Sequence, residues 1–350
     1  MLENVQFILI IFIVFYLIIL LYDLMILFSK KKEEVKIERK KKELINNINN
    51  ISLLNRKLKN KKYLYTLGII LEENKDIVKT LKDKKYINLF EKLINYYDNQ
   101  DLIYKTYYAY ILGIIGNGTK IINDFLLKLV IVDSIYANKN ALDALNKIKD
   151  IDSIIEAFKQ ISFNNINLSN RLMFSALNKY NGNKNNLCKK AYQNFKNFNE
   201  EVKISFINYF AKNNYDIKEE LVKSLKSKKI DKELELAIIR YFKINKSNDA
   251  LELFINRLND NYYSDFEYEV VLIQTLSNYS DEKVVNAIMN KIISPNYYVR
   301  KNAAIALNKL VNVNLLKSIN DKYAKEMLDY ISKTEINFKK NYKFDLKTAK

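Results

Sequence analysis

The sequence predicts an all-α fold built from repeated pairs of helices. Seven short apolar segments recur along the chain, and an equivalent apolar reference position can be chosen in each: Leu112, Leu145, Leu177, Phe210, Phe242, Leu276 and Leu307. Successive reference positions are 33, 32, 33, 32, 34 and 31 residues apart. A near-constant spacing of this size is typical of a solenoid of helix pairs, which forms a long surface for binding partners. One Pro and five Gly in 350 residues also favour helices over a strand-rich fold.

Each segment carries a continuous apolar stripe. The residues three and four positions before every reference position are apolar as well: Ala109, Tyr108, Leu142, Ala141, Phe174, Met173, Ile207, Phe206, Ile239, Ile238, Ile273, Leu272, Ala304 and Ala303. These positions share one face of a helix, so we expect seven core-facing helices. Six amphipathic partner helices are expected between them, at 121–130, 151–161, 187–198, 217–225, 251–258 and 284–293.

The opposite face of the same seven helices is mostly polar. It comprises the residues two before and one after each reference position, and we expect it to meet solvent or a partner. The candidate partner-binding residues on this face are Tyr110, Asp143, Asn146, Ser175, Asn178, Asn208, Arg240, Lys243, Gln274, Ser277, Ile305 and Asn308.

The last repeat carries a recognisable pattern, in the order Pro295, Val299, Arg300, Ala303, Ala304, Ala306 and Leu307. It resembles the second helix of a HEAT repeat, of the short kind seen in bacterial phycobilin-lyase-like HEAT proteins. Residues 101–116 match more loosely, and the five middle repeats share only the period. At the position of the HEAT arginine, the seven repeats carry Lys105, Asn138, Asn170, Lys203, Glu235, Glu269 and Arg300. The resemblance implies a right-handed α-solenoid of about seven HEAT-like helix pairs, with a role in binding and scaffolding.

Residues 5–28 form a second strong feature, an apolar run in which only Gln6 and Asp23 are clearly polar. As a helix it would be about 36 Å long, enough for a hydrocarbon core of ~30 Å. The start of the chain lacks Lys and Arg, and no small-residue cleavage site follows, which disfavours a signal peptide. We therefore expect one N-terminal transmembrane helix. The basic residues after it predict a single-pass protein of the cytoplasmic membrane, with the N-terminus outside and the bulk of the chain cytoplasmic.

The net charge of +18 is concentrated next to this run. Residues 29–62 hold 13 basic and 4 acidic side chains (+9), 333–350 hold 6 and 2 (+4), and 63–332 hold 39 and 32 (+7). We expect a helical juxtamembrane stub at 29–62, the solenoid at 63–332 and a disordered basic tail at 333–350. Anionic lipid head groups are candidate ligands of the stub, although its lysines could instead reflect topology and a lysine-rich composition. The residues expected at the membrane surface are Lys30, Lys31, Lys32, Lys36, Arg39, Lys40, Lys41 and Lys42.

The composition excludes several catalytic classes. The chain has no His, which removes Ser-His-Asp and Cys-His machinery, and its one cysteine, Cys188, cannot form a thiolate zinc site or an internal disulfide. The glycine-rich segment 113–120 lacks the Gly-Lys-Ser/Thr order of a phosphate loop. We therefore expect no enzymatic activity, no cofactor and no metal.

Three functions remain in consideration. The first is a membrane-anchored scaffold that binds proteins on the cytoplasmic side, in a narrower form as an assistant to an envelope machine. The alternative is a nucleic-acid-binding HEAT-like protein tethered to the membrane, which the near-neutral segment 63–332 disfavours. The second alternative, a lyase-like HEAT enzyme, follows only from the family resemblance. No residue selects a particular protein partner.

Overall fold

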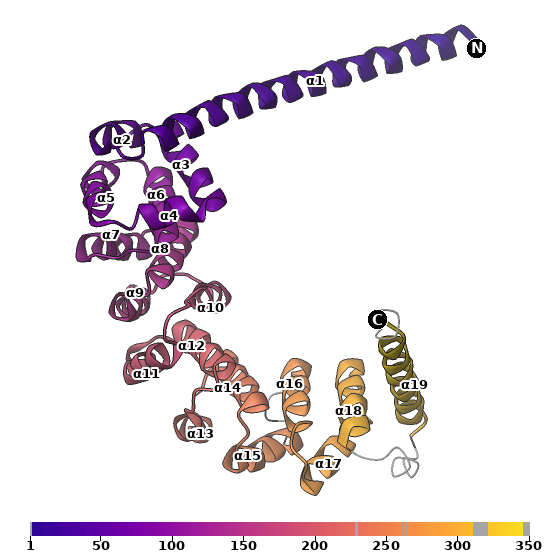
Figure 1. The fold of residues 1–350 in the computed structure, drawn as a ribbon. Coiled ribbons are helices and arrows are strands. Elements are labelled where there is room, and N and C mark those ends of the chain that lie inside the picture. Colours follow the sequence, from indigo (N-terminus) through magenta and orange to yellow (C-terminus); the bar gives the residue numbers. More distant parts are fainter. Residues whose placement is uncertain (1, 228–229, 261, 263–264, 311–320, 346–350) are drawn as a thin grey trace. The chain divides into compact units, whose positions relative to one another are not determined.

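The computed structural model describes residues 2–227, 230–260, 262, 265–310 and 321–345, with side chains described between positions 14 and 334 of these ranges. This part of the chain contains 19 α-helices and one short 3-10 helix, and no strand (Figure 1). The predicted all-α class is confirmed. The chain divides into two compact units, Met1–Ala157 and Phe158–Lys350, hereafter unit 1 and unit 2.

Unit 1 arranges its helices in two rows, and each helix contacts the next one in its row (Figure 1). The first row consists of α1 (Leu2–Asn46), α3 (Lys61–Glu73), α6 (Leu102–Ile115) and α8 (Ile135–Ile148). The second row consists of α2 (Ile51–Leu58), α5 (Lys84–Tyr97) and α7 (Lys120–Val130). The short helix α4 (Lys75–Thr80) follows α3, and α9 (Ile151–Phe163) contains the boundary between the units.

Unit 2 repeats the two-row arrangement. Its first row consists of α10 (Asn170–Leu177), α12 (Glu200–Lys212), α14 (Lys232–Ile244), α16 (Phe266–Leu276), α18 (Tyr297–Leu310) and α19 (Lys322–Asp345). The second row consists of α11 (Lys184–Gln193), α13 (Lys218–Lys226), α15 (Asn248–Asn259) and α17 (Glu282–Met289). The 3-10 helix η1 (Phe195–Asn197) follows α11.

The predicted apolar stripes form the core of both units. The seven reference helices are α6, α8, α10, α12, α14, α16 and α18, and the expected partners correspond to α7, α9, α11, α13, α15 and α17. Every stripe residue is buried except Phe174, which is half-buried. Each helix thus removes one apolar face from water by packing against the neighbouring pair, an arrangement that fits a HEAT-like fold.

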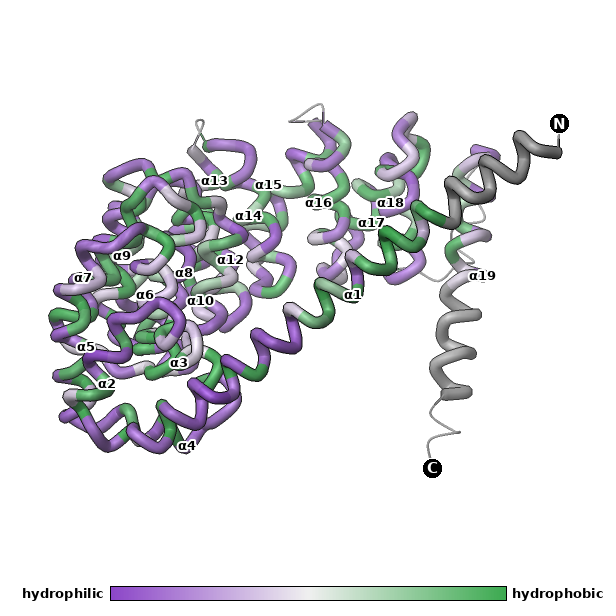
Figure 2. Tube along the Cα trace, turned by 90° about the horizontal axis from the view of Figure 1, so that it is seen from above, coloured by the Kyte–Doolittle hydropathy of each residue, from purple (hydrophilic) through white to green (hydrophobic). Residues whose placement is uncertain are grey.

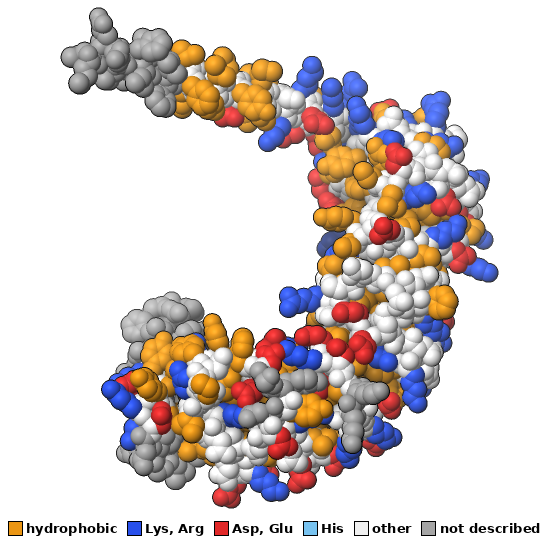
Figure 3. Space-filling view, turned by 180° about the vertical axis from the view of Figure 1, so that it is seen from behind, with side chains coloured by type: hydrophobic (Ala, Val, Ile, Leu, Met, Phe, Trp, Pro, Cys, Tyr) orange, Lys and Arg blue, Asp and Glu red, His pale blue; other side chains and the backbone are white. Residues whose placement is uncertain are grey.

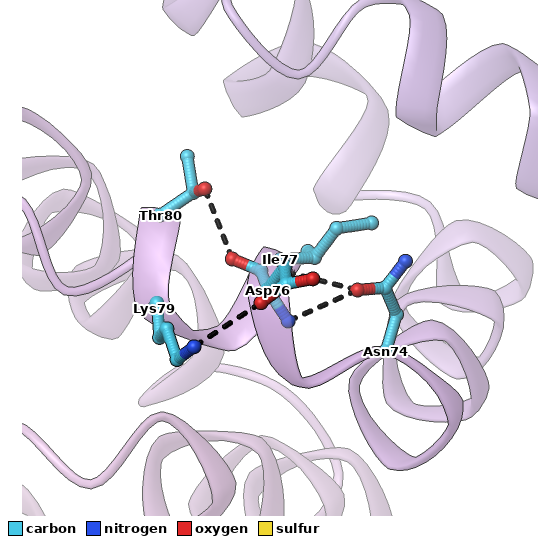
Figure 4. Close-up of polar contacts among 5 residues, drawn as sticks. All are labelled: Asn74, Asp76, Ile77, Lys79 and Thr80. Carbon is cyan, nitrogen blue, oxygen red and sulfur yellow. Dashed lines mark hydrogen bonds and ion pairs between the residues drawn. The ribbon is translucent and has the colours of Figure 1, made fainter.

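Polar side chains start the helices of this glycine-poor chain. The side chain of Asn74 accepts hydrogen bonds from the backbone N–H groups of Asp76 (3.0 Å) and Ile77 (3.1 Å), and so caps the first turn of α4 (Figure 4). In the same helix Lys79 pairs with Asp76 at 3.2 Å, and the Thr80 hydroxyl donates to the Asp76 carbonyl at 3.0 Å. Such caps satisfy the unpaired N–H groups at a helix start, which lets Asn and Asp replace Gly and Pro as turn residues.

In several repeats, the residue at the position of the HEAT arginine makes a polar contact with a neighbouring segment, although the residue type changes. The Asn138 side chain donates to the carbonyls at the end of α7, including that of Val130 at 2.8 Å. Arg300 donates to the Ser294 carbonyl at 2.6 Å. Glu235 and Glu269 form ion pairs instead, and the Glu269 carboxylate lies 2.6 Å from the Lys291 ammonium.

In the repeat of Glu235 the cationic partner is Arg257, whose guanidinium donates to the Glu235 carboxylate and to the Leu225 carbonyl, the latter at 2.5 Å. In the repeats of Asn138 and Glu235, a carbonyl at the end of one helix is therefore bonded to a side chain of a neighbouring helix, directly or through an ion pair. Buried carbonyls need such partners, so the polar character of this position is retained while its identity varies.

The predicted transmembrane helix is corrected. Among the described residues, no helix combines the length and the apolar character that crossing a membrane demands. The part of the predicted span whose side chains are described is the apolar run 14–28. The helix α1 continues from this run directly into its Lys- and Arg-rich part (Figures 2 and 3). Residues 5–13 of the predicted span have side chains outside the described part.

The predicted localisation is corrected with it, because the single-pass topology at the cytoplasmic membrane depended on that span. At the other end of the chain, helix α19 includes most of the segment for which a disordered tail was expected. Residues 346–350 of that segment lie outside the described residues.

Candidate functional site

A hollow of ≈ 570 Å³ lies on the first row of unit 1, where side chains of α3, α6 and α8 meet. Its walls are mostly apolar, and we call it the tyrosine groove after its main components. They are Tyr65, Tyr104, Tyr107, Tyr110 and Tyr136, together with Leu64, Leu102 and Ile103. A concave, largely apolar surface of this size is the usual form of a ligand-binding site.

Tyr107 lies at the centre of the ring cluster. Its ring centroid is 5.9 Å from that of Tyr65 and 5.6 Å from that of Tyr110, with interplanar angles of 31° and 34°. The Tyr107 hydroxyl donates to the Tyr65 carbonyl at 3.2 Å, and the Tyr110 hydroxyl donates to the Glu72 carboxylate. Because both hydroxyls are used within unit 1, these residues offer mainly their ring surfaces to a ligand.

A glycine on α3 makes the position of Tyr107 possible. A Cβ atom added at Gly68 would lie only 2.1 Å from the Tyr107 hydroxyl oxygen, well inside van der Waals contact. Gly68 is buried within α3, where Gly is less favourable than Ala by about 0.5–1 kcal/mol. The unfavourable residue is explained by the close approach of Tyr107, which it allows.

Tyr107 and Tyr110 keep their protons at neutral pH. Burial raises the pKa of Tyr107 to about 12, and the neighbouring Tyr65 and Glu72 contribute in the same direction. The pKa of Tyr110 is also raised, first by burial and second by the hydrogen bond to Glu72. The groove therefore presents neutral aromatic rings, which suit apolar groups of a ligand.

Large apolar side chains at the rim of the groove are left uncovered. Tyr136 is 81% exposed and Ile103 is 76% exposed, and Tyr65 is also exposed. Single exposed apolar residues are ordinary, but a contiguous group of them around a hollow marks an interaction surface.

A second hollow, of ≈ 530 Å³, adjoins the tyrosine groove and shares Lys61, Tyr65 and Tyr104 with it. We call it the lysine pocket, because Lys32, Lys36 and Lys40 of α1 and Lys61 and Lys62 of α3 line it. Among its lining residues the one acid is Glu33.

The lysine pocket is electrostatically unfavourable for the charged form of Lys40. Burial, followed by the positive charges of Lys62, Arg39 and Lys36, lowers the pKa of Lys40. At the boundary with the tyrosine groove, the Lys61 ammonium lies 3.7 Å from the centroid of the Tyr104 ring. An anion placed in this pocket would reduce the repulsion among the lysines.

Only one residue of the predicted partner-binding face, Tyr110, lies in the tyrosine groove. Asp143 and Asn146 were expected to meet solvent and are buried instead. The reason is the close approach of α6 and α8, since a Cβ added at Gly113 would lie 2.8 Å from the Cα of Ala144. Within α8 the Asp143 carboxylate pairs with Lys139 at 2.8 Å, and the Asn146 amide donates to the Leu142 carbonyl at 2.8 Å.

The members of this face in unit 2 are distributed over α10, α12, α14, α16 and α18. Several of them connect neighbouring helices: Asn178 accepts from Lys212 at 2.7 Å, and Gln274 donates to Asn302 at 2.9 Å. Ser175, Asn178, Arg240, Lys243, Gln274 and Ile305 are exposed, whereas Asn208, Ser277 and Asn308 are half-buried. A binding role for these residues stays a prediction.

The basic residues of α1 differ in their surroundings. Lys30, Lys31, Lys32, Lys36, Arg39 and Lys42 are exposed, and Lys40 and Lys41 are half-buried. Lys41 pairs with Glu38 at 2.8 Å and with Glu73 at 2.9 Å, which attaches α1 to the end of α3. Contact of these residues with a membrane surface stays a prediction.

Sequence reasoning missed the tyrosine groove. The available signal was a group of tyrosines outside the apolar stripes, at positions 65, 104, 107, 110 and 136. Their convergence depends on which helices pack together, and the period alone does not specify this. In the described part of the chain, no group of three or more His, Cys, Asp or Glu side chains is arranged to hold a metal ion.

Neither a protein-family model nor a curated protein matches this chain. Similar solved structures include human deoxyhypusine hydroxylase in complex with glycerol, at 11% identity and a TM-score of 0.31, covering 76% of this chain and 98% of that one. An engineered protein matches at 17% identity and a TM-score of 0.32, covering 79% of this chain and 86% of its own. Since an enzyme is among these matches, the expectation that the chain is not an enzyme is corrected to an open question. At such TM-scores the likeness assigns no activity to this chain.

Proposed function

We propose that this protein is a helical-repeat binding protein that holds an apolar segment of a partner protein in the tyrosine groove. The observation that carries the proposal is the groove itself, whose aromatic and aliphatic walls are open to solvent. Interfaces gain most of their affinity from a few aromatic side chains that become fully buried on binding. Tyr136 and Ile103, which are the most exposed wall residues, are the expected anchors.

The groove is also prepared for binding before a partner arrives. Tyr107 is fixed by its hydrogen bond to the Tyr65 carbonyl and by its contact with Gly68, and Tyr110 is fixed by Glu72. Side chains that are already ordered lose little conformational entropy on association, so more of the burial energy appears as affinity.

The proposal is tested by peptide display on the full chain. Random peptides are selected on the wild-type protein and their affinities are compared with those for Tyr136→Ser/Ile103→Ser. The matched control is Tyr323→Ser/Ile293→Ser, which removes an exposed Tyr and an exposed Ile from unit 2. We expect the selected peptides to be rich in apolar residues and to lose about tenfold or more in affinity for the groove variant. Equal affinities for both variants, or no selection of apolar peptides, would refute the proposal.

A further inference from the structure

We infer that the segment held in the tyrosine groove is an amphipathic α-helix whose acidic end enters the lysine pocket. This inference rests on the proposed function and adds the conformation and charge of the ligand. It follows from two separate properties of unit 1, namely the engagement of several polar groups of the groove within unit 1 and the concentration of positive charge at one end.

The first property concerns the hydrogen bonds of the groove walls. The Thr106 hydroxyl donates to the Leu102 carbonyl at 2.8 Å, and the Asn140 amide donates to the Tyr136 carbonyl at 2.8 Å. The hydroxyls of Tyr107 and Tyr110 are engaged as described above. Beside these four side chains, an extended ligand would therefore bury backbone N–H and C=O groups against polar groups that are already engaged.

An α-helix avoids this cost, because its backbone groups are paired within the segment itself. One apolar stripe of such a helix, at spacings of three and four residues, is the form in which helices enter apolar grooves of partner proteins. The walls of the tyrosine groove, contributed by α3, α6 and α8, suit such a stripe.

The second property concerns charge. Five lysines line the lysine pocket together with one acid, so positive charge exceeds negative charge among the lining side chains. Acidic side chains at the end of a bound helix would supply the missing negative charge. Acidic residues are also favourable in the first turn of a helix, so the N-terminal end of the ligand is the better fit.

A nucleic-acid strand fits the same surfaces less well. Aromatic rings beside lysines are typical of single-strand binding, but a strand carries a phosphate at every nucleotide and needs cations along its whole path. In the tyrosine groove the one cationic wall residue is Lys61, at the boundary with the lysine pocket. Glu72 lies at the other side, bonded to Tyr110. The separation of charge from apolar surface favours a ligand with the same separation.

The test uses a displayed library of amphipathic helices in which the apolar face is randomised and the first-turn positions are free to be Glu, Gln or Lys. Selection is carried out on the full-length protein. We expect Glu to be enriched over Gln and Lys, and central proline substitutions in selected clones to abolish binding. A (dT)-oligonucleotide is measured in parallel, and binding of it in the groove with higher affinity than any helix would overturn the inference in favour of a nucleic acid.

Protein variants distinguish the role of the lysine pocket from that of the tyrosine groove. Lys32→Gln/Lys36→Gln changes two exposed lysines of the lysine pocket, and Lys30→Gln/Lys31→Gln removes the same charge from the same helix outside the pocket. We expect the first pair to weaken Glu-rich helices about five- to tenfold at low salt and the control pair less than twofold.

Three outcomes would overturn the inference. They are equal effects of the two lysine pairs, the absence of Glu enrichment, and tight binding of proline-substituted clones. If these occur while Tyr136→Ser/Ile103→Ser still weakens binding about tenfold, the inference fails and the proposed function stands. If no helix is selected while random apolar peptides still bind the groove, the inference alone fails. If the groove variant has no effect on any selected peptide, both fail.

Discussion

Replacing Glu235 with Ala should lower the free energy of unfolding of unit 2 by about 3–5 kcal/mol. The Glu235 side chain is 0% exposed and that of its partner Arg257 is 9% exposed. The Tyr268 hydroxyl donates to the same carboxylate, and Arg257 also donates to the Leu225 carbonyl. Without Glu235, a guanidinium and a phenol hydroxyl remain buried and lose their acceptor, and an uncompensated buried charge is the larger part of the cost.

The matched control is Glu267→Ala. Its partner Arg240 lies 3.8 Å away, and the two side chains are 45% and 54% exposed, so the pair should contribute less than about 1 kcal/mol. Urea unfolding followed by far-ultraviolet circular dichroism gives the overall effect. Because the two units can unfold separately, hydrogen exchange of peptides from α13 to α16 assigns the effect to unit 2.

The reasoning would be refuted if Glu235→Ala cost no more than Glu267→Ala. A second measurement distinguishes a buried charge from a simple cavity. In the double variant Glu235→Leu/Arg257→Met, both charges are removed together, so the stability should recover most of what Glu235→Ala loses. A double variant as unstable as the single one would indicate that packing, and not charge, explains the loss.

Three further predictions concern other parts of the chain. Gly113→Ala should destabilise unit 1 by about 1–3 kcal/mol in thermal unfolding, because the added Cβ meets the α8 backbone at Ala144; a gain from helix propensity alone would contradict this. Burial raises the pKa of the Cys188 thiol to about 12, so a thiol-specific disulfide reagent at pH 8 should label the native protein at least ~100-fold more slowly than the protein in urea, and rapid native labelling would disprove it. The hydrogen bond from Lys232, followed by that from the Glu267 backbone, lowers the pKa of Asp265. The charged Asp265 therefore stabilises the fold above its unfolded pKa of about 3.9, and this stabilisation is lost as the pH falls through the lower folded value. Acid should therefore destabilise wild type more than Lys232→Gln between pH 6 and pH 2, whereas equal acid dependence would count against the bond.

The helices and the core residues were accessible from the sequence because the signal is local and repeated. Apolar residues at three- and four-residue spacing define a buried face within a single helix, and seven repeats average out the irregular ones. Phe174, the one stripe residue that is half-buried, belongs to α10, one of the shortest reference helices. The helix pairs could be predicted from this pattern without knowledge of how they pack.

The N-terminal prediction was wrong. It combined the apolar run at 5–28 with a helix length sufficient for a bilayer, whereas the described part of α1 does not meet the required combination of length and apolar character. The same helix is attached to the first row of unit 1 by Leu44, which is buried, and by the ion pairs of Lys41.

By itself the sequence determined which residues form helices and which face of each helix is buried, because both depend on neighbours within one or two turns. Only the tertiary structure decided what the other faces do. The close approach of Gly113 to Ala144 buries Asp143 and Asn146, and Gly68 brings Tyr107 against α3 to form the tyrosine groove. Both effects depend on distances between backbones of different helices, which are set by the side chains at each crossing and leave no periodic trace in the sequence.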